Sequence, residues 1–186
     1  MKLFKKLAAA ALAAVLALSM VGCGNANSVN STKQLTLDMI SEFAAMNDAE
    51  INNTAEMDDI AQKLLNKAAE LYGADEYAGA PVVTLLEAAS KKDGMGFDAT
   101  KTYLVSYAED YQYKSSLVSN VNKQYNFFMN LLYKGFTVSQ QSVSVNMRNV
   151  KKADVGVAVG KIGDKTYVVM VMMPTETAAV PGTGKD

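Results

Sequence analysis

The chain contains no histidine, and Cys23 is its one cysteine. Without histidine, the Ser-His-Asp and Cys-His nucleophile systems are excluded, and so are the zinc and copper sites that rely on imidazole ligands. One cysteine cannot form a disulfide within the chain, so the folded part must be held together by its core. A metal site would need oxygen ligands alone, and the Asp-x-Asp-x-Asp-Gly pattern of calcium loops is missing. We therefore expect no catalytic residue of the familiar kinds, no metal and no cofactor.

Basic residues are also few, with 18 lysines and arginines against 19 acidic residues and a net charge of −1. No basic block lies beyond the N-terminal lysines, so nucleic acid is not expected as a partner, nor is electrostatic adhesion to an anionic membrane. A glycine-rich phosphate loop is missing as well, because Gly156, Gly160 and Gly163 fall inside a strand pattern and its turn.

The N-terminal residues have the pattern of an export signal. A cationic start at residues 1–6 precedes an almost unbroken apolar run at residues 7–21. This order is typical of a secretory signal peptide. The apolar run is shorter than the roughly 20 residues that a membrane-spanning helix needs.

The apolar run ends in Met-Val-Gly-Cys at residues 20–23, which resembles the lipobox of bacterial lipoproteins. The resemblance implies that residues 1–22 are removed and that Cys23 becomes the lipidated first residue. Two or more acyl chains anchor a protein stably, at about 0.8 kcal/mol per buried methylene, and bacterial lipoproteins carry at least a diacylglycerol. The expected partner is thus a membrane, contacted through the lipid on Cys23. The expected location is the outer face of the cytoplasmic membrane, or the periplasmic face of an envelope membrane.

The rest of the chain divides into three parts. Residues 23–34 are small and polar, which predicts a flexible tether. Residues 35–173 carry the apolar periodicities and are numerous enough for one domain with a core. Residues 174–186 contain two prolines and no periodicity, which predicts a disordered tail.

Apolar spacing predicts four helices in this domain. Asn53 and Glu56 resemble a capping box at the start of the second helix, and Gly73 supplies its end. Pro81 suits the first turn of the third helix. The four helices are expected at about 36–47, 53–72, 81–92 and 115–134.

Strands are predicted at 102–107 and, most clearly, at 154–162 and 165–173. The last two flank Gly163-Asp164, which is a two-residue hairpin signature. The stretch 143–147 fits a strand and a helical turn equally well.

The last predicted strand is apolar on both faces, so we expect both faces to be covered. The preceding strand has one small face, formed by Gly156, Ala158 and Gly160, which would let a helix approach closely. Together these patterns predict an α+β fold, a three-layer α-β-α sandwich with a small, mainly antiparallel sheet and a C-terminal β-hairpin.

Three short segments and the order of the elements carry a family resemblance. They are MNDAE at 46–50, MDDIAQKL at 57–64, and VGVAV at 155–159 followed by KTYV at 165–168. In the same order they resemble the first-helix element, the second helix and the closing hairpin of the CAP superfamily, which includes cysteine-rich secretory proteins, antigen 5 and plant pathogenesis-related proteins. Glu50 stands in place of the arginine of the first element.

The CAP resemblance implies a cleft with two histidines and two acidic residues that can hold a divalent cation. This chain lacks both histidines, so a domain of this family would have lost its metal site. Ala108-Glu109-Asp110 corresponds to the family's glycine-glutamate-asparagine, and Glu109 is the one residue that the resemblance carries over.

Glu109 is therefore the candidate binding residue. It lies in a tyrosine-rich stretch, and a carboxylate among aromatic rings can have a raised pKa or can bind a sugar. A solvated turn between a strand and a helix explains the same residues. The methionine-rich strand at 168–173 likewise fits either an ordinary core strand or the wall of a lipid pocket.

From these observations we expect a lipid-anchored extracytoplasmic domain that binds or interacts, without catalytic or metal machinery. Its partner would be an envelope protein, peptidoglycan or a small apolar ligand. The alternative is a hydrolase of cell-envelope glycans that uses carboxylates alone, about 5–9.5 Å apart, with Glu109 paired with Glu70 or Asp110. A spacer or envelope-assembly factor without a ligand is a third interpretation.

Overall fold

The computed structural model describes residues 28–109, 117–139 and 150–177. Within these ranges the chain forms four α-helices, one short 3-10 helix and five strands. In chain order they are α2 (Ser28–Met46), β1 (Glu50–Asn53), α3 (Ala55–Tyr72), η1 (Asp75–Tyr77), α4 (Val82–Ser90), β2 (Tyr103–Glu109), α5 (Leu117–Tyr133), β3 (Gly135–Val138), β4 (Val150–Ile162) and β5 (Lys165–Thr177).

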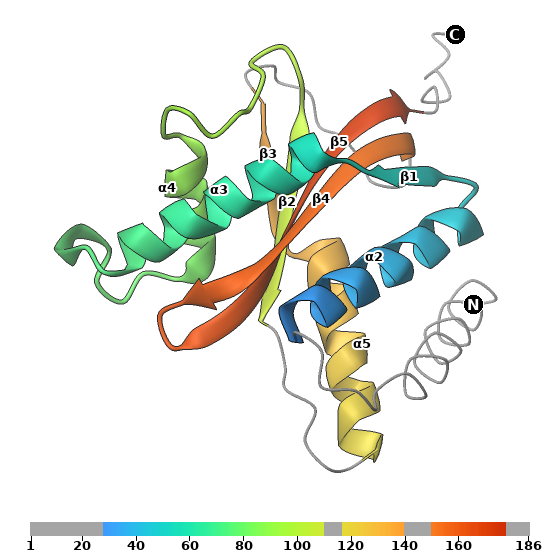
Figure 1. The fold of residues 1–186 in the computed structure, drawn as a ribbon, viewed down its shortest axis with the longest axis horizontal. Coiled ribbons are helices and arrows are strands. Elements are labelled where there is room, and N and C mark those ends of the chain that lie inside the picture. The colour runs from blue at the N-terminus through green and yellow to red at the C-terminus, as the bar shows by residue number, and fades with distance from the viewer. Residues whose placement is uncertain (1–27, 110–116, 140–149, 178–186) are drawn as a thin grey trace, which may run out of the picture.

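The strands form one sheet in the order β1-β4-β5-β2-β3. Only β1 and β4 run parallel, and the other neighbouring pairs are antiparallel. Helices α3 and α4 cover one face of the sheet, and α2 and α5 cover the other (Figure 1). The predicted α+β, three-layer sandwich with a C-terminal hairpin is therefore confirmed.

Alternation along β5 divides the core into two clusters. Val169 and Val171 face α3 and α4, whereas Met170 and Met172 face α2 and α5. Because successive side chains of a strand point to opposite faces, a strand that is apolar throughout can supply both cores. The prediction that both faces of this strand are covered is thus confirmed.

The hairpin turns at Gly163-Asp164, as predicted, and Gly163 has the positive φ of 65° that such turns require. Both strands are longer than expected, because β4 begins at Val150 and β5 continues to Thr177. The first residues of the predicted tail are therefore in the sheet. Pro174 pairs in register with Ala153, next to an irregularity of β4, where a missing N–H donor is tolerated.

The predicted tether is wrong from Ser28 onward, because α2 begins there. Its polar first turns are held by one contact distant in the sequence and by one hydrogen bond within the helix. Lys33 forms an ion pair with Asp58 of α3 at 2.6 Å, and the fully buried Thr36 donates its hydroxyl to the carbonyl of Thr32. Neither α2 nor another helix in the described ranges has the length and apolarity to cross a membrane.

The start of the second predicted helix also differs from the structure. Thr54, not Asn53, caps α3, and its hydroxyl accepts a hydrogen bond from the N–H of Met57. Asn53 instead ends β1 and donates its side-chain amide to the carbonyl of Val155. The two four-residue strands, β1 and β3, were not predicted, and the ambiguous stretch 143–147 lies outside the described residues.

Helix α3 lies directly on β4 at Gly156. A Cβ atom at this position would overlap the backbone of Met57 and Asp58, so only glycine allows the contact. At Gly160 an added Cβ would lie 2.8 Å from a side-chain methyl of Leu65, which has freedom to move. The predicted close approach of a helix to this small face is confirmed.

The carboxylate of Asp58 accepts a hydrogen bond from the edge of β4 at the point where pairing with β1 has ended. It accepts hydrogen bonds from the Val157 N–H at 2.9 Å, the Asn53 amide at 3.0 Å and the Lys33 ammonium at 2.6 Å. Burial raises the pKa of Asp58, but these hydrogen bonds together outweigh burial, so the pKa of this carboxyl is lowered from its ordinary value.

We expect Gly156→Ala to lower the free energy of unfolding by about 3 kcal/mol, because the new methyl group must displace helix backbone. Gly160→Ala is the matched control. It should cost about 1 kcal/mol, since a flexible leucine side chain can move aside. Urea denaturation measures both, and equal losses in the two variants would contradict the close contact at Gly156.

We expect Asp58→Ala to lower stability at neutral pH by about 2 kcal/mol. The same change at its exposed neighbour Asp59, which pairs with Lys63, should cost about 0.5 kcal/mol. Because folding lowers the pKa of Asp58, its contribution is present above the unfolded pKa of about 3.9 and is lost as the pH falls through the folded value. Asp58→Ala should therefore lose less stability than the unaltered protein between pH 7 and about pH 2.5 in urea titrations. An unchanged acid loss would contradict this assignment.

Candidate functional site

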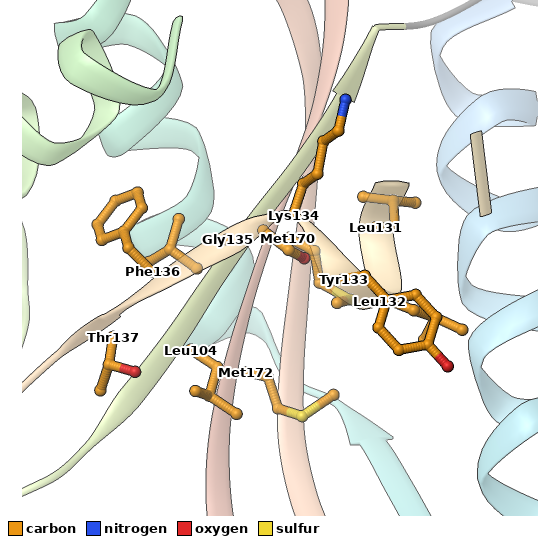
Figure 2. A pocket seen from close by; sticks show the side chains of 12 residues that line it. Leu104, Leu131, Leu132, Tyr133, Lys134, Gly135, Phe136, Thr137, Met170 and Met172 are labelled. Atoms are coloured by element: carbon orange, nitrogen blue, oxygen red, sulfur yellow. The ribbon is translucent and has the colours of Figure 1, made fainter. Parts of the chain in front are cut away.

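A pocket of about 160 Å³ lies on the α5 side of the sheet, next to the junction where α5 ends and β3 begins. Figure 2 shows Leu104 and Met172 next to each other, with Leu132 and Tyr133 on one side of them and Phe136 on another. The apolar side chains of its lining on the α5 side are Leu104, Leu131, Leu132, Met170 and Met172, whereas Phe136 of β3 also borders the pocket but packs its side chain against the core cluster on the α3 and α4 side.

Strand register brings these residues together. Leu104 of β2 pairs with Met172 of β5, and Ser106 pairs with Met170, so all four belong to the face that α5 covers. Across the other edge of β2, Ser106 pairs with Gly135 of β3. A Cβ atom on Gly135 would overlap the carbonyl of Val105, so glycine lets the chain turn sharply from the helix back onto the sheet.

Ser106 is the residue that distinguishes this pocket from ordinary core. It lines the pocket and is 8% exposed, and its Oγ is the one buried side-chain polar atom without a hydrogen-bond partner in the described ranges. An unsatisfied buried hydroxyl costs about 1–3 kcal/mol. The Oγ atom has almost no accessible surface, so the hydroxyl is buried in the wall behind the pocket and is not presented to its open space.

The remaining polar side chains of the lining, Tyr133, Lys134 and Thr137, are exposed, with Tyr133 at 65%. They form the rim, and no acidic side chain belongs to the lining. The pocket thus combines apolar side chains of β2, β5 and α5 with exposed polar groups at its rim, an arrangement that suits a small, partly apolar molecule.

A second, wider groove of about 660 Å³ lies between the C-terminal end of α4, the loop that follows it and strands β2 and β3. Its charges are mixed, with Glu87, Asp98 and Lys101 among them. Hydrogen bonds from the N–H and hydroxyl of Thr100 lower the pKa of Asp98, and the Asp98 N–H donates to the hydroxyl of Tyr103. These groups satisfy one another, so the groove has the character of a solvated loop.

The candidate binding residue Glu109 lies at the exposed end of β2. Its carboxylate pairs with Lys165 at 3.0 Å, and this hydrogen bond raises the pKa of Lys165. Burial, followed by the charge of Glu109, raises the pKa of Tyr167 on the adjacent strand. Glu109 lines neither of the two pockets, and its contacts are those of a surface ion pair.

The two partners considered for Glu109 are not brought to it by any contact that the structure shows. Glu70 of α3 forms an exposed ion pair with Lys67, and Asp110 lies outside the described residues, as does Cys23. Within the described ranges, no group of three acidic, histidine or cysteine side chains is placed to hold a metal ion.

The sequence alone does not indicate that Ser106 is a buried residue of the pocket wall. The available signal was a lone hydroxyl between Leu104 and Ala108 on one face of a short apolar strand, a pattern that does not reveal whether the hydroxyl has a partner. The methionine-rich strand was expected to be either an ordinary core strand or the wall of a pocket. Met170 and Met172 are core residues, and they also line the pocket.

We expect Ser106→Ala to raise the free energy of unfolding by about 1 kcal/mol, because it removes a buried hydroxyl without a partner. Thr36→Val is the matched control, since Thr36 is also buried but its hydroxyl is bonded to a carbonyl. Its loss should cost about 1 kcal/mol. Thermal and urea denaturation distinguish the two, and a destabilised Ser106→Ala would contradict an unpartnered hydroxyl.

In comparisons with protein-family models, curated proteins and solved structures, none matches this chain. The resemblances to a lipobox and to the CAP superfamily thus stay predictions from the motifs quoted above. A shared fold would not by itself determine function, which resides in the site.

Proposed function

We propose that this protein is a bacterial lipoprotein whose extracytoplasmic domain binds a small apolar ligand. Acyl chains on Cys23 hold it at the outer face of the cytoplasmic membrane, or at the periplasmic face of an envelope membrane. The observation that carries the binding role is the pocket beneath the end of α5, whose lining includes Leu104, Met170 and Met172. The lipobox at residues 20–23 supports the anchor.

Because α2 begins at Ser28, the connection between the proposed anchor at Cys23 and the domain is short. Residues 24–27 separate Cys23 from Ser28, and even a fully extended chain spans at most about 3.6 Å per residue. The helix therefore begins within about 20 Å of an anchored Cys23. Because Met39 and Ile40 of α2 pack in the same core cluster as the pocket residue Met170, the pocket belongs to a unit held close to the membrane.

The carboxylates considered for the alternative, a glycan hydrolase, have other roles in the described structure. Glu109 is exposed and paired with Lys165, and Glu70 is paired with Lys67. A glycosidase needs two carboxyl groups that face each other across the bound sugar, and these two carboxylates are instead engaged in separate surface ion pairs. These contacts favour binding over hydrolysis.

The anchor is tested by expressing the full chain in a bacterium that is fed tritiated palmitate. We expect the unaltered chain to become labelled and to partition into the detergent phase of a Triton extraction. Cys23→Ser should lose the label, because the thiol side chain that carries the acyl chains is gone. Ser19→Ala, a change in the leader that keeps the cysteine, is the control and should be labelled normally. An unlabelled unaltered chain, or a label that persists in Cys23→Ser, would overturn the proposed anchor.

A further inference from the structure

We infer that the exposed face of α5, defined by Tyr125, Met129 and Tyr133, lies against the headgroup region of the bilayer that holds the lipid anchor. This inference rests on the anchor proposed above and goes beyond it, because it gives the folded domain a second membrane contact and a fixed orientation. Three observations carry it, which are the exposure of these side chains, the absence of acidic residues from α5 and the short connection to Cys23.

The exposed face of α5 is aromatic. Tyr125 and Tyr133 are 45% and 65% exposed, and the half-buried Met129 lies between them. Residues four apart are neighbours on a helix surface, so the three side chains form one stripe. Phe128 and Leu131, on the other side of the helix, are buried in the core. A surface helix ordinarily has charged or polar residues where α5 has this stripe.

The third exposed tyrosine of the described ranges has a structural explanation. Tyr72 ends α3 in the opposite layer and is 46% exposed. Its ring lies over the hairpin turn, where a Cβ atom on Gly163 would be 2.5 Å from it. Contact with the turn accounts for Tyr72, so the two tyrosines of α5 are the ones that call for a partner outside the domain.

Charge also distinguishes α5 from its neighbours. In the described ranges it is the one α-helix without an acidic residue, and its one charged residue is Lys123. Exposed carboxylates occur on α2, at Asp38 and Glu42, and on α3, at Glu56 and Glu70. Burying a carboxylate against lipid costs free energy, whereas tyrosine is enriched at membrane–water interfaces because its ring is amphipathic. The bilayer surface therefore suits α5 better than it suits α2 or α3.

The anchor is close enough to favour this contact. Helix α2 begins within about 20 Å of Cys23, and α2 and α5 cover the same face of the sheet (Figure 1). The rings of Phe43 and Phe128 join the two helices, with their centroids 5.6 Å apart. A short linker gives an effective concentration of about 1 mM, so a contact of about millimolar affinity is occupied roughly half of the time. A stripe too weak to bind a membrane by itself can thus orient an anchored domain.

The test uses the full lipidated protein in lipid nanodiscs, one copy per disc, and exploits the absence of tryptophan from the chain. In Tyr125→Trp and Tyr133→Trp the new indole is the one tryptophan, and phospholipids with brominated acyl chains quench it on contact. We expect each variant to lose about half of its emission in brominated discs, relative to ordinary discs, as the occupancy requires. Tyr72→Trp is the matched control, because Tyr72 is similarly exposed on the opposite layer, and it should keep its emission.

A carboxylate within the exposed face should remove the contact. Asn126 is exposed next to Tyr125, and Asn126→Glu in the Tyr133→Trp background should abolish the quenching, because the new charge would have to be buried against lipid. Asn66→Glu, the same change at an exposed position of α3, is the control and should leave the quenching unaltered.

Quenching of Tyr72→Trp equal to that of the α5 variants, or no quenching of the α5 variants, would overturn the inference. Quenching that persists in Asn126→Glu would also overturn it. So would a blue-shifted emission without quenching, because protein and not lipid would then cover this face. Palmitate labelling of the same preparations reports the anchor independently. A labelled protein without quenching disproves the α5 contact alone, whereas an unlabelled protein disproves the proposed anchor and, with it, the orientation.

Discussion

The contact between the first turn of α3 and Gly156 of β4 is the constraint on which the other layers depend. Because a glycine removes the side chain at this point, the helix backbone lies directly on the strand. The neighbouring Asp58 then accepts a hydrogen bond from the N–H of Val157, which lies on the edge of β4 just beyond the last residue paired with β1. The same carboxylate binds Lys33 of α2, so one acidic residue joins the sheet to helices on both of its faces.

The strand pair at the centre of the sheet connects this constraint to the pocket. Val155 and Val157 of β4 face the α2 and α5 side, because Gly156 faces α3. The paired strand β5 follows the same alternation, and Met170 and Met172 reach the α5 side. Each core thus receives a complete set of apolar side chains, and the pocket lies within the α5 core, where the helix ends.

The wall of the pocket contains a hydroxyl, that of Ser106, which lowers the stability of the fold because it has no hydrogen-bond partner in the described ranges. A satisfied hydroxyl such as that of Thr36 contributes to the fold, whereas the hydroxyl of Ser106 costs free energy until it finds a partner. Alanine would fit the same position on β2 without this cost. The structure therefore tolerates at Ser106 a group that is unfavourable for the folded state alone.

Local patterns in the sequence determined the exclusion of histidine and disulfide chemistry, the hairpin turn at Gly163-Asp164 and the α+β class. These features depend on composition, on periods of two and 3.6 residues, or on one turn, all of which are readable over short stretches. The small face of β4 likewise predicted a close helix contact, because the absence of side chains is visible in the sequence itself.

Only the tertiary structure decided the features that depend on distant partners. β1 and β3 are four residues long and are strands because β4 and β2 pair with them. The polar start of α2 is helical where a tether was expected, with Lys33 bound to Asp58. Glu109 became a surface ion pair because Lys165 lies on the neighbouring strand. The role of Ser106 is the clearest case, since whether a buried hydroxyl has a partner is a property of its surroundings in space and not of its neighbours in the chain.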